Sequence, residues 1–140
     1  MINKDEIIKE QASKAVLWIN RLSTTRVKQG TGQLGDRSNG YCCLGYGCKI
    51  LGIDFDSDDA DSRDFMEKVG MTSMGGNFDN PMTKIDENNN DAMSLIDLND
   101  DHGFSFRRIS TVIKSKIDEI FEKDVAIEIY KMLKNKRVQV

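Results

Sequence analysis

Apolar residues recur every three or four positions over residues 4–22, the spacing that aligns side chains along one face of an α-helix. The members of this stripe are Ile7, Ile8, Ala12, Ala15, Val16, Ile19 and Leu22. Trp18 lies beside the stripe, and because large aromatic side chains are buried on average, we expect it to cover the edge of the core. The pattern predicts a long N-terminal amphipathic helix.

A second stripe with helical spacing fills the C-terminal third of the chain. It follows Ser105 and consists of Phe106, Ile109, Val112, Ile113, Ile117, Ile120, Phe121, Val125, Ile129, Met132 and Leu133. Such a stripe is typical of helices that bury one face. We expect this region to be helical, with a bend near residues 123–124.

The segment after the first helix is rich in glycine and contains the turn dipeptide Asn39-Gly40. This dipeptide favours a tight turn between paired strands, so we expect a short β-hairpin between about Val27 and Tyr41. The next residues are small and apolar, and they predict a closely packed helix that ends at Gly52.

Weaker patterns follow in the middle of the chain. We expect a short helix over about residues 61–69 and a loop over residues 75–81. A further short helix is expected to carry Ala92, Met93, Leu95, Ile96 and Leu98. These elements together predict a small, helix-dominated α+β fold, with residues 1–140 forming a single domain and one short hairpin in the glycine-rich segment.

Composition adds limits to this picture. The chain has 140 residues, of which 39% are hydrophobic, and this is enough for one core without disulfide or metal staples. It contains no apolar run near the ~18 residues of a membrane span and no signal-peptide pattern, so we expect a cytoplasmic protein without a membrane partner. The cysteines Cys42, Cys43 and Cys48 lack the paired spacing of a zinc site, and we expect neither a disulfide nor a metal.

Charge is distributed unevenly along the chain. Residues 1–53 carry eight basic and four acidic side chains, residues 54–101 carry three and fourteen, and residues 107–137 carry nine and five. Phosphate neutralisation supplies most of a protein's non-specific affinity for DNA, so the acidic middle makes nucleic acid an unexpected partner. A small anion needs only a local basic pocket and remains compatible with this distribution.

One group of residues has the chemistry of a nucleotide-binding site. Arg26, Lys28, Gln29, Gly30 and Gly32 are followed by Tyr41, which together provide cations for phosphate, backbone N–H groups for its oxygens and a flat ring for a base. A glycine-rich surface hairpin with incidental charges would contain the same residues, and no phosphate-loop or dinucleotide motif is present.

Four strings in order carry a resemblance. They are Trp18 with Leu22, Lys28-Gln29-Gly30-x-Gly32-x-Leu34, Tyr41-Cys42-Cys43-Leu44-Gly45-x-x-Cys48, and Leu98-Asn99-Asp100-x-x-Gly103-x-Ser105-Phe106-x-x-Ile109. In this respect the chain resembles a widespread family of small bacteriophage proteins over about residues 15–53 and 92–113. It departs from that family in the aspartate- and asparagine-rich middle and in the C-terminal helix.

The family is similar to viral sponge proteins of the anti-CBASS type, which bind cyclic dinucleotide signals of antiphage immunity without hydrolysing them. The resemblance implies no enzyme activity, no cofactor, a homo-oligomer such as a dimer or tetramer, and action in the cytoplasm of the bacterial host. It also implies that Gln29 and the backbone of Gly30 and Gly32 contact phosphate or ribose. Asn99 and Asp100 would contact a base edge, and Arg107 would supply a second cation. The alternative for the Leu98–Phe106 string is a helix stop followed by a capped helix start.

Two other functions fit parts of the sequence. Residues 95–113 have the order of a helix-turn-helix unit, in which Arg107 and Arg108 would face DNA, although acidic residues lie at the same turn. The acidic middle alternatively suggests a protein that inhibits a host protein by mimicking DNA.

Overall fold

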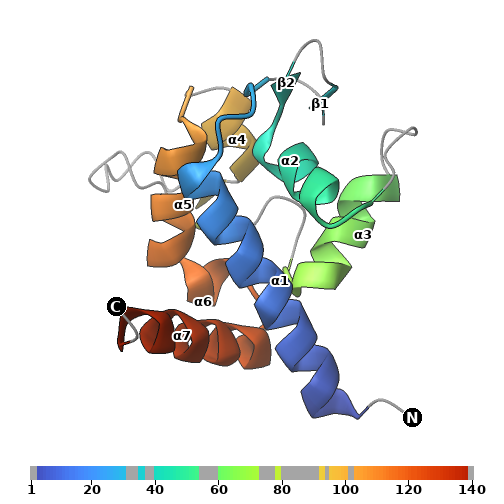
Figure 1. The fold of residues 1–140 in the computed structure, drawn as a ribbon, viewed down its shortest axis with the longest axis vertical. Helices are drawn as coiled ribbons and strands as arrows, with labels where there is room; N and C mark the ends of the chain where they lie inside the picture. The colour runs from blue at the N-terminus through green and yellow to red at the C-terminus, as the bar shows by residue number, and fades with distance from the viewer. Residues whose placement is uncertain are drawn as a thin grey trace.

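The computed structural model describes residues 3–30, 35–36, 40–53, 60–72, 78–79, 92–93, 95–100 and 103–138. Helix α1 (Lys4–Thr24) crosses the molecule and packs against α3, α5 and α7, as Figure 1 shows. Asn3 caps this helix, since its side-chain oxygen accepts a 2.9 Å hydrogen bond from the Glu6 N–H. The predicted N-terminal helix is confirmed.

The predicted hairpin forms, but with strands of only two residues. β1 (Gly35–Asp36) pairs antiparallel with β2 (Gly40–Tyr41). Gln29 adds a parallel bridge to Tyr41 on the other side of β2. Asn39 of the turn dipeptide lies outside the described residues, whereas Gly40 has the positive φ of 88° that a tight turn favours.

Helices α2 (Cys43–Ile50) and α3 (Ala60–Val69) match the two helices predicted for these regions. Trp18 of α1 is fully buried beside them, and therefore lies deeper than the core edge where we expected it. Its indole N–H donates a 3.0 Å hydrogen bond to the Cys43 carbonyl, and its ring meets the Phe65 ring edge-on at 4.8 Å. A Cβ at Gly47 would overlap the Phe65 ring, so this glycine lets α2 and α3 approach each other.

The prediction that Ala92 and Met93 begin a helix is wrong. They form β4 (Ala92–Met93), which pairs antiparallel with β3 (Phe78–Asp79), and α4 (Leu95–Asp100) begins after them. The loop expected over residues 75–81 contains β3, and its other residues lie outside the described chain. Pairing with the strand at residues 78–79 has overridden the local helical spacing.

The C-terminal stripe is divided among three helices, α5 (Phe106–Ser115), α6 (Ile117–Ile120) and α7 (Lys123–Val138). The predicted bend is confirmed just before α7, where the Glu122 N–H donates to the Gly70 carbonyl at 2.8 Å. Met71 also bridges to Phe121. Backbone pairing with residues 70–72 therefore ends α6 and redirects the chain.

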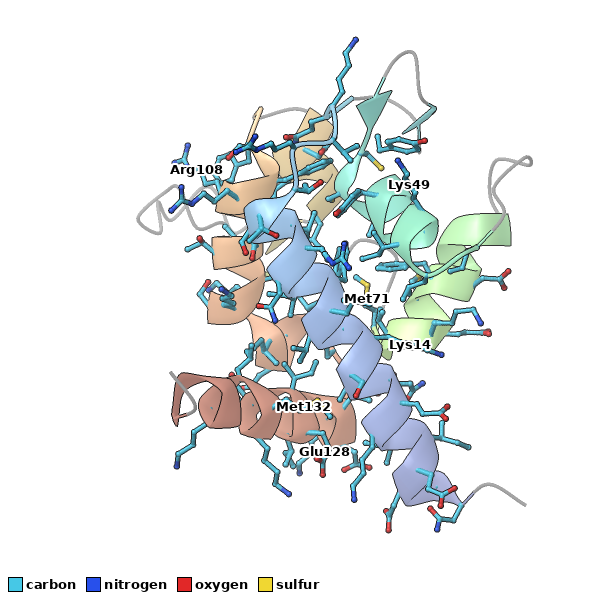
Figure 2. All side chains as sticks on the ribbon, viewed as in Figure 1. Lys14, Lys49, Met71, Arg108, Glu128 and Met132 are labelled. Carbon is cyan, nitrogen blue, oxygen red and sulfur yellow. The ribbon has the colours of Figure 1, made fainter. Side chains whose placement is uncertain are left out.

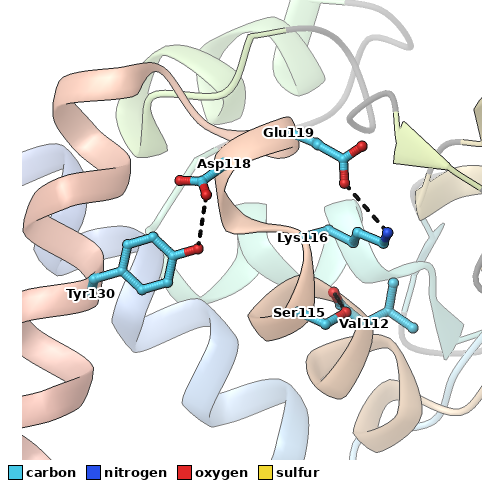
Figure 3. Close-up of polar contacts among 6 residues, drawn as sticks. All are labelled: Val112, Ser115, Lys116, Asp118, Glu119 and Tyr130. Atoms are coloured by element: carbon cyan, nitrogen blue, oxygen red, sulfur yellow. Dashed lines mark hydrogen bonds and ion pairs between the residues drawn. The ribbon is translucent and has the colours of Figure 1, made fainter.

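Polar contacts on α6 and α7 appear in Figure 3. The Tyr130 hydroxyl donates to an Asp118 carboxylate oxygen at 3.3 Å, and Lys116 forms a 3.5 Å ion pair with Glu119. Burial, and then the charge and hydrogen bond of Asp118, raise the pKa of Tyr130 above its ordinary value of 10.0.

The described residues thus form a helix-dominated fold around a hydrophobic core that α1 crosses. The strands contribute only two pairs of two residues each. No helix within the described ranges is long and apolar enough to cross a membrane.

Candidate functional site

A network of side-chain amides joins residues 29–30 to the start of α5. The Gln29 Nε2 group donates to Asn99 Oδ1 at 2.8 Å and to the Phe104 carbonyl at 2.6 Å, while Gln29 Oε1 accepts from the Phe106 N–H at 3.0 Å. Asn99 Nδ2 in turn donates to the Gly30 carbonyl at 2.8 Å. We call these bonds the Gln29–Asn99 network.

The network gives Gln29 and Asn99 structural roles. Asn99 has no exposed surface, and buried amides require hydrogen-bond partners inside the protein. The sequence suggested Gln29 as a contact to phosphate or ribose and Asn99 as a contact to a base edge. These suggestions need correction, because both amides point at the protein's own backbone and at each other.

The same segment is fixed on its other side by β2. The Gly30 N–H donates to the Tyr41 carbonyl at 2.8 Å, and the Tyr41 N–H donates to the Lys28 carbonyl at 2.9 Å. A Cβ at Gly40 would come within 2.8 Å of that Lys28 oxygen, so the close approach of the two segments requires glycine. Residues 28–30 are thereby held between β2 and the α4–α5 junction.

Tyr41 is only 7% exposed, and the Lys49 ammonium group lies 4.9 Å from the centre of its ring. Stacking on a base requires an accessible ring face, which the buried Tyr41 does not offer in this structure. The prediction that Tyr41 stacks on a base therefore also needs correction. Sequence reasoning missed Lys49, since no spacing rule relates the end of α2 to a residue of β2.

The cations of the predicted site are exposed near the Gln29–Asn99 network. Lys28 directly precedes Gln29, and Arg107 directly follows Phe106, so the 3.0 Å bond from the Phe106 N–H to the Gln29 side chain ties the residues next to these two cations together. Arg26 is exposed in the same connection.

Arg108 was expected only in the helix-turn-helix alternative, yet it lies beside the same network. Its guanidinium group lies 4.0 Å from the centre of the Phe104 ring. Figure 2 shows Arg108 and Lys49 at the same end of the molecule, on opposite sides of it.

The stretch between α4 and α5 is a helix stop followed by a capped start, as the alternative interpretation predicts. Gly103 has a φ of 65°, and the Phe104 N–H returns to the Leu98 carbonyl at 3.0 Å. The Ser105 hydroxyl oxygen then accepts from the Arg108 N–H at 3.2 Å. Asp100 ends α4, but its side chain, like the whole of Gly32, lies outside the described part of the structure.

The described part of the chain also contains three cysteines and a groove. Cys42, Cys43 and Cys48 are all buried. Over the described ranges, no three His, Cys, Asp or Glu side chains come together as metal ligands would. A groove of about 450 Å³ lies between α1 and α7, away from the network, and its lining mixes both charges: Lys4, Asp5, Ile8, Lys9, Asp124, Ile127 and Glu128.

Comparison with known proteins adds no further assignment: no protein-family model, curated protein or solved structure matches this chain. The bacteriophage-family resemblance therefore stays a prediction.

Proposed function

We propose that the protein binds a small nucleotide with several negative charges, of the cyclic dinucleotide class, and holds it intact. The supporting observation is the Gln29–Asn99 network, which ties the segment that carries Lys28 to the start of α5, which carries Arg107. Cations whose backbones are already ordered lose less conformational freedom when a ligand binds.

The phosphates would be bound by Arg26, Lys28 and Arg107, all of which are exposed. Guanidinium groups match phosphate geometry with two parallel hydrogen bonds, and they also stack on aromatic planes. Because Tyr41 is buried, base recognition falls to the arginines in this proposal. Gln29 and Asn99 act indirectly, by holding the two basic segments together.

Capture without turnover fits the described chemistry, because sequestration needs cations and no nucleophile. The buried positions of the three thiols are compatible with this, since a catalytic thiolate needs access to its substrate. In the phage setting that the resemblance implies, the protein would remove an immune signal in the host cytoplasm. A dimer or tetramer would match the two-fold character of a cyclic dinucleotide.

A thermal-shift panel of cyclic and linear dinucleotides tests this function. A ligand at 100 times its dissociation constant stabilises the native state by ~2.7 kcal/mol. The double variant Arg26→Ala/Lys28→Ala should lose this stabilisation, whereas Lys134→Ala, which removes an exposed cation from α7, should keep it.

The bound nucleotide should be recovered chemically unchanged after the complex is denatured by heat. Linear or hydrolysed products would overturn sequestration, and a panel without any stabilising nucleotide would overturn the binding site. The mass of the protein in solution, measured with and without the ligand, tests the oligomer.

A further inference from the structure

The exposed face of α5 has an unusual composition. Its members are separated by helical spacing and share one stripe: Arg107, Arg108, Thr111, Lys114 and Ser115. The opposite stripe is buried in the core and consists of Phe106, Ile109, Ser110, Val112 and Ile113. The solvent side of α5 therefore presents three cations and no carboxylate.

This absence of acids extends beyond α5. Neither residues 11–30 nor residues 103–117 contain an aspartate or glutamate, although the chain as a whole has 23 of them. α1 packs against α5, and the Gln29–Asn99 network attaches the connection after α1 to the start of α5. The fold thus brings together two acid-free basic segments that are distant in sequence.

The side chains between the cations are short. The Thr111 hydroxyl donates to the Arg107 carbonyl at 3.2 Å, and the Ser115 hydroxyl donates to the Val112 carbonyl at 2.8 Å. Because these side chains are short and their hydroxyls bond to their own helix, they leave room for a ligand backbone to approach the face. The neighbouring cations supply the attraction.

The aromatic residues nearest this face are not available for base stacking. Phe104 and Phe106 are at most 5% exposed, and Trp18 and Tyr46 are buried as well. Proteins that bind single strands rely on exposed rings on which bases stack. A basic helical face without such rings is better suited to the regularly spaced phosphates of a duplex.

We propose that the exposed face of α5 binds the phosphate backbone of duplex DNA without reading its sequence. Duplex DNA carries one negative charge per ~1.7 Å of its axis, so several cations on one helix face can meet several phosphates at once. The acidic residues that made DNA an unexpected partner lie in residues 54–101, which precede Gly103. The exposed face of α5 begins after Gly103, at Arg107. This activity is separate from nucleotide capture, and it depends on Arg108 and Lys114, which that proposal does not use.

The test is fluorescence anisotropy of a labelled mixed-sequence duplex, titrated with the full-length protein at several salt concentrations. The affinity should fall steeply with salt, because each neutralised phosphate contributes about 0.9 to the slope of log affinity against log salt. In Arg108→Ala/Lys114→Ala the slope should become shallower by about two. Lys134→Ala should leave it unchanged.

Three outcomes would overturn the proposal. They are an affinity that does not depend on salt, an unchanged slope in the Arg108→Ala/Lys114→Ala variant, and equal affinity for a single strand or for anionic lipid vesicles. Circular dichroism and nucleotide binding by the same variant serve as its folding controls. A variant that loses DNA but keeps nucleotide separates this proposal from nucleotide capture, as does the reverse result for Arg26→Ala/Lys28→Ala.

Discussion

At the scale of single residues, the Gln29–Asn99 network is the feature that holds together the basic end of the molecule. We use this name for the end that carries Arg26, Lys28 and Arg107. Four hydrogen bonds of 2.6 to 3.0 Å link residues about 70 positions apart. Asn99 is fully buried, so its side-chain amide depends on hydrogen-bond partners within the protein.

We therefore expect Asn99→Ala to lower the free energy of unfolding by about 1–3 kcal/mol, because it leaves the Gly30 carbonyl without its amide donor. Urea denaturation measures this loss. Gln11→Ala is the matched control, since it removes one exposed amide bond to the Glu67 carbonyl and should cost less. Equal losses in the two variants would contradict the special role of Asn99.

The sequence identified Gln29 and Asn99 as polar residues worth attention, but it misassigned their partners. Their hydrogen bonds depend on how α4 is placed against the α1–β1 connection, and no local spacing contains that information. The same limit applies to Tyr41, whose neighbour Lys49 belongs to α2. Exposure of Arg26, Lys28 and Arg107 was easier to anticipate, because charged side chains rarely enter a core.

At the scale of elements, the contact between α2 and α3 depends on the absence of a side chain at Gly47. In an isolated helix, alanine is more stabilising than glycine by about 1 kcal/mol. Helix propensity alone therefore predicts that Gly47→Ala stabilises the protein. Overlap with the buried Phe65 ring should make the substitution destabilising instead. This ring also packs against Trp18, so it cannot easily move away from the new methyl group.

We expect Gly47→Ala to destabilise the protein by about 1–3 kcal/mol, the usual cost of overpacking a core. Thermal or urea unfolding gives the value. In Gly47→Ala/Phe65→Leu the smaller side chain relieves the overlap, so the combined loss should be less than the sum of the two single losses. Strict additivity would show that the two positions do not meet.

Helical periodicity located α1 and α5 because each buries one stripe, whereas α2 was located by its run of small and apolar residues. The sequence anticipated the bend before α7 but not its cause, the backbone pairing of residues 120–122 with residues 70–72. It also missed the strand at Ala92, which forms by backbone pairing with Phe78–Asp79. Apolar side chains continue through such a break, so the pattern of side chains conceals it.

At the scale of the whole molecule, α1 is the helix that the others share. It contacts α3, α5 and α7, and its residues Ala15, Trp18 and Ile19 have no exposed surface. Its first two turns are mostly exposed. Stability should therefore vary along this single helix.

Native-state hydrogen exchange should show this difference. Amide hydrogens of residues 15–22 should exchange only through global unfolding. Those of residues 7–10 should exchange through local openings that have a lower free energy. Adding denaturant separates the two classes, because only global opening depends strongly on its concentration. Faster exchange in the centre of α1 than in α7 would contradict this account of the core.

Gly40 makes the hairpin and the basic end vulnerable to a single methyl group. A side chain at this position would press on the main chain of residues 28–29, which cannot rotate away as a side-chain tip can. The repacking would fall on the segment that connects the cations, far from the contacts between α1 and α7. Position 40 is therefore a natural place to look for a separation-of-function allele, one that remains folded and abundant in cells but no longer presents an ordered binding surface.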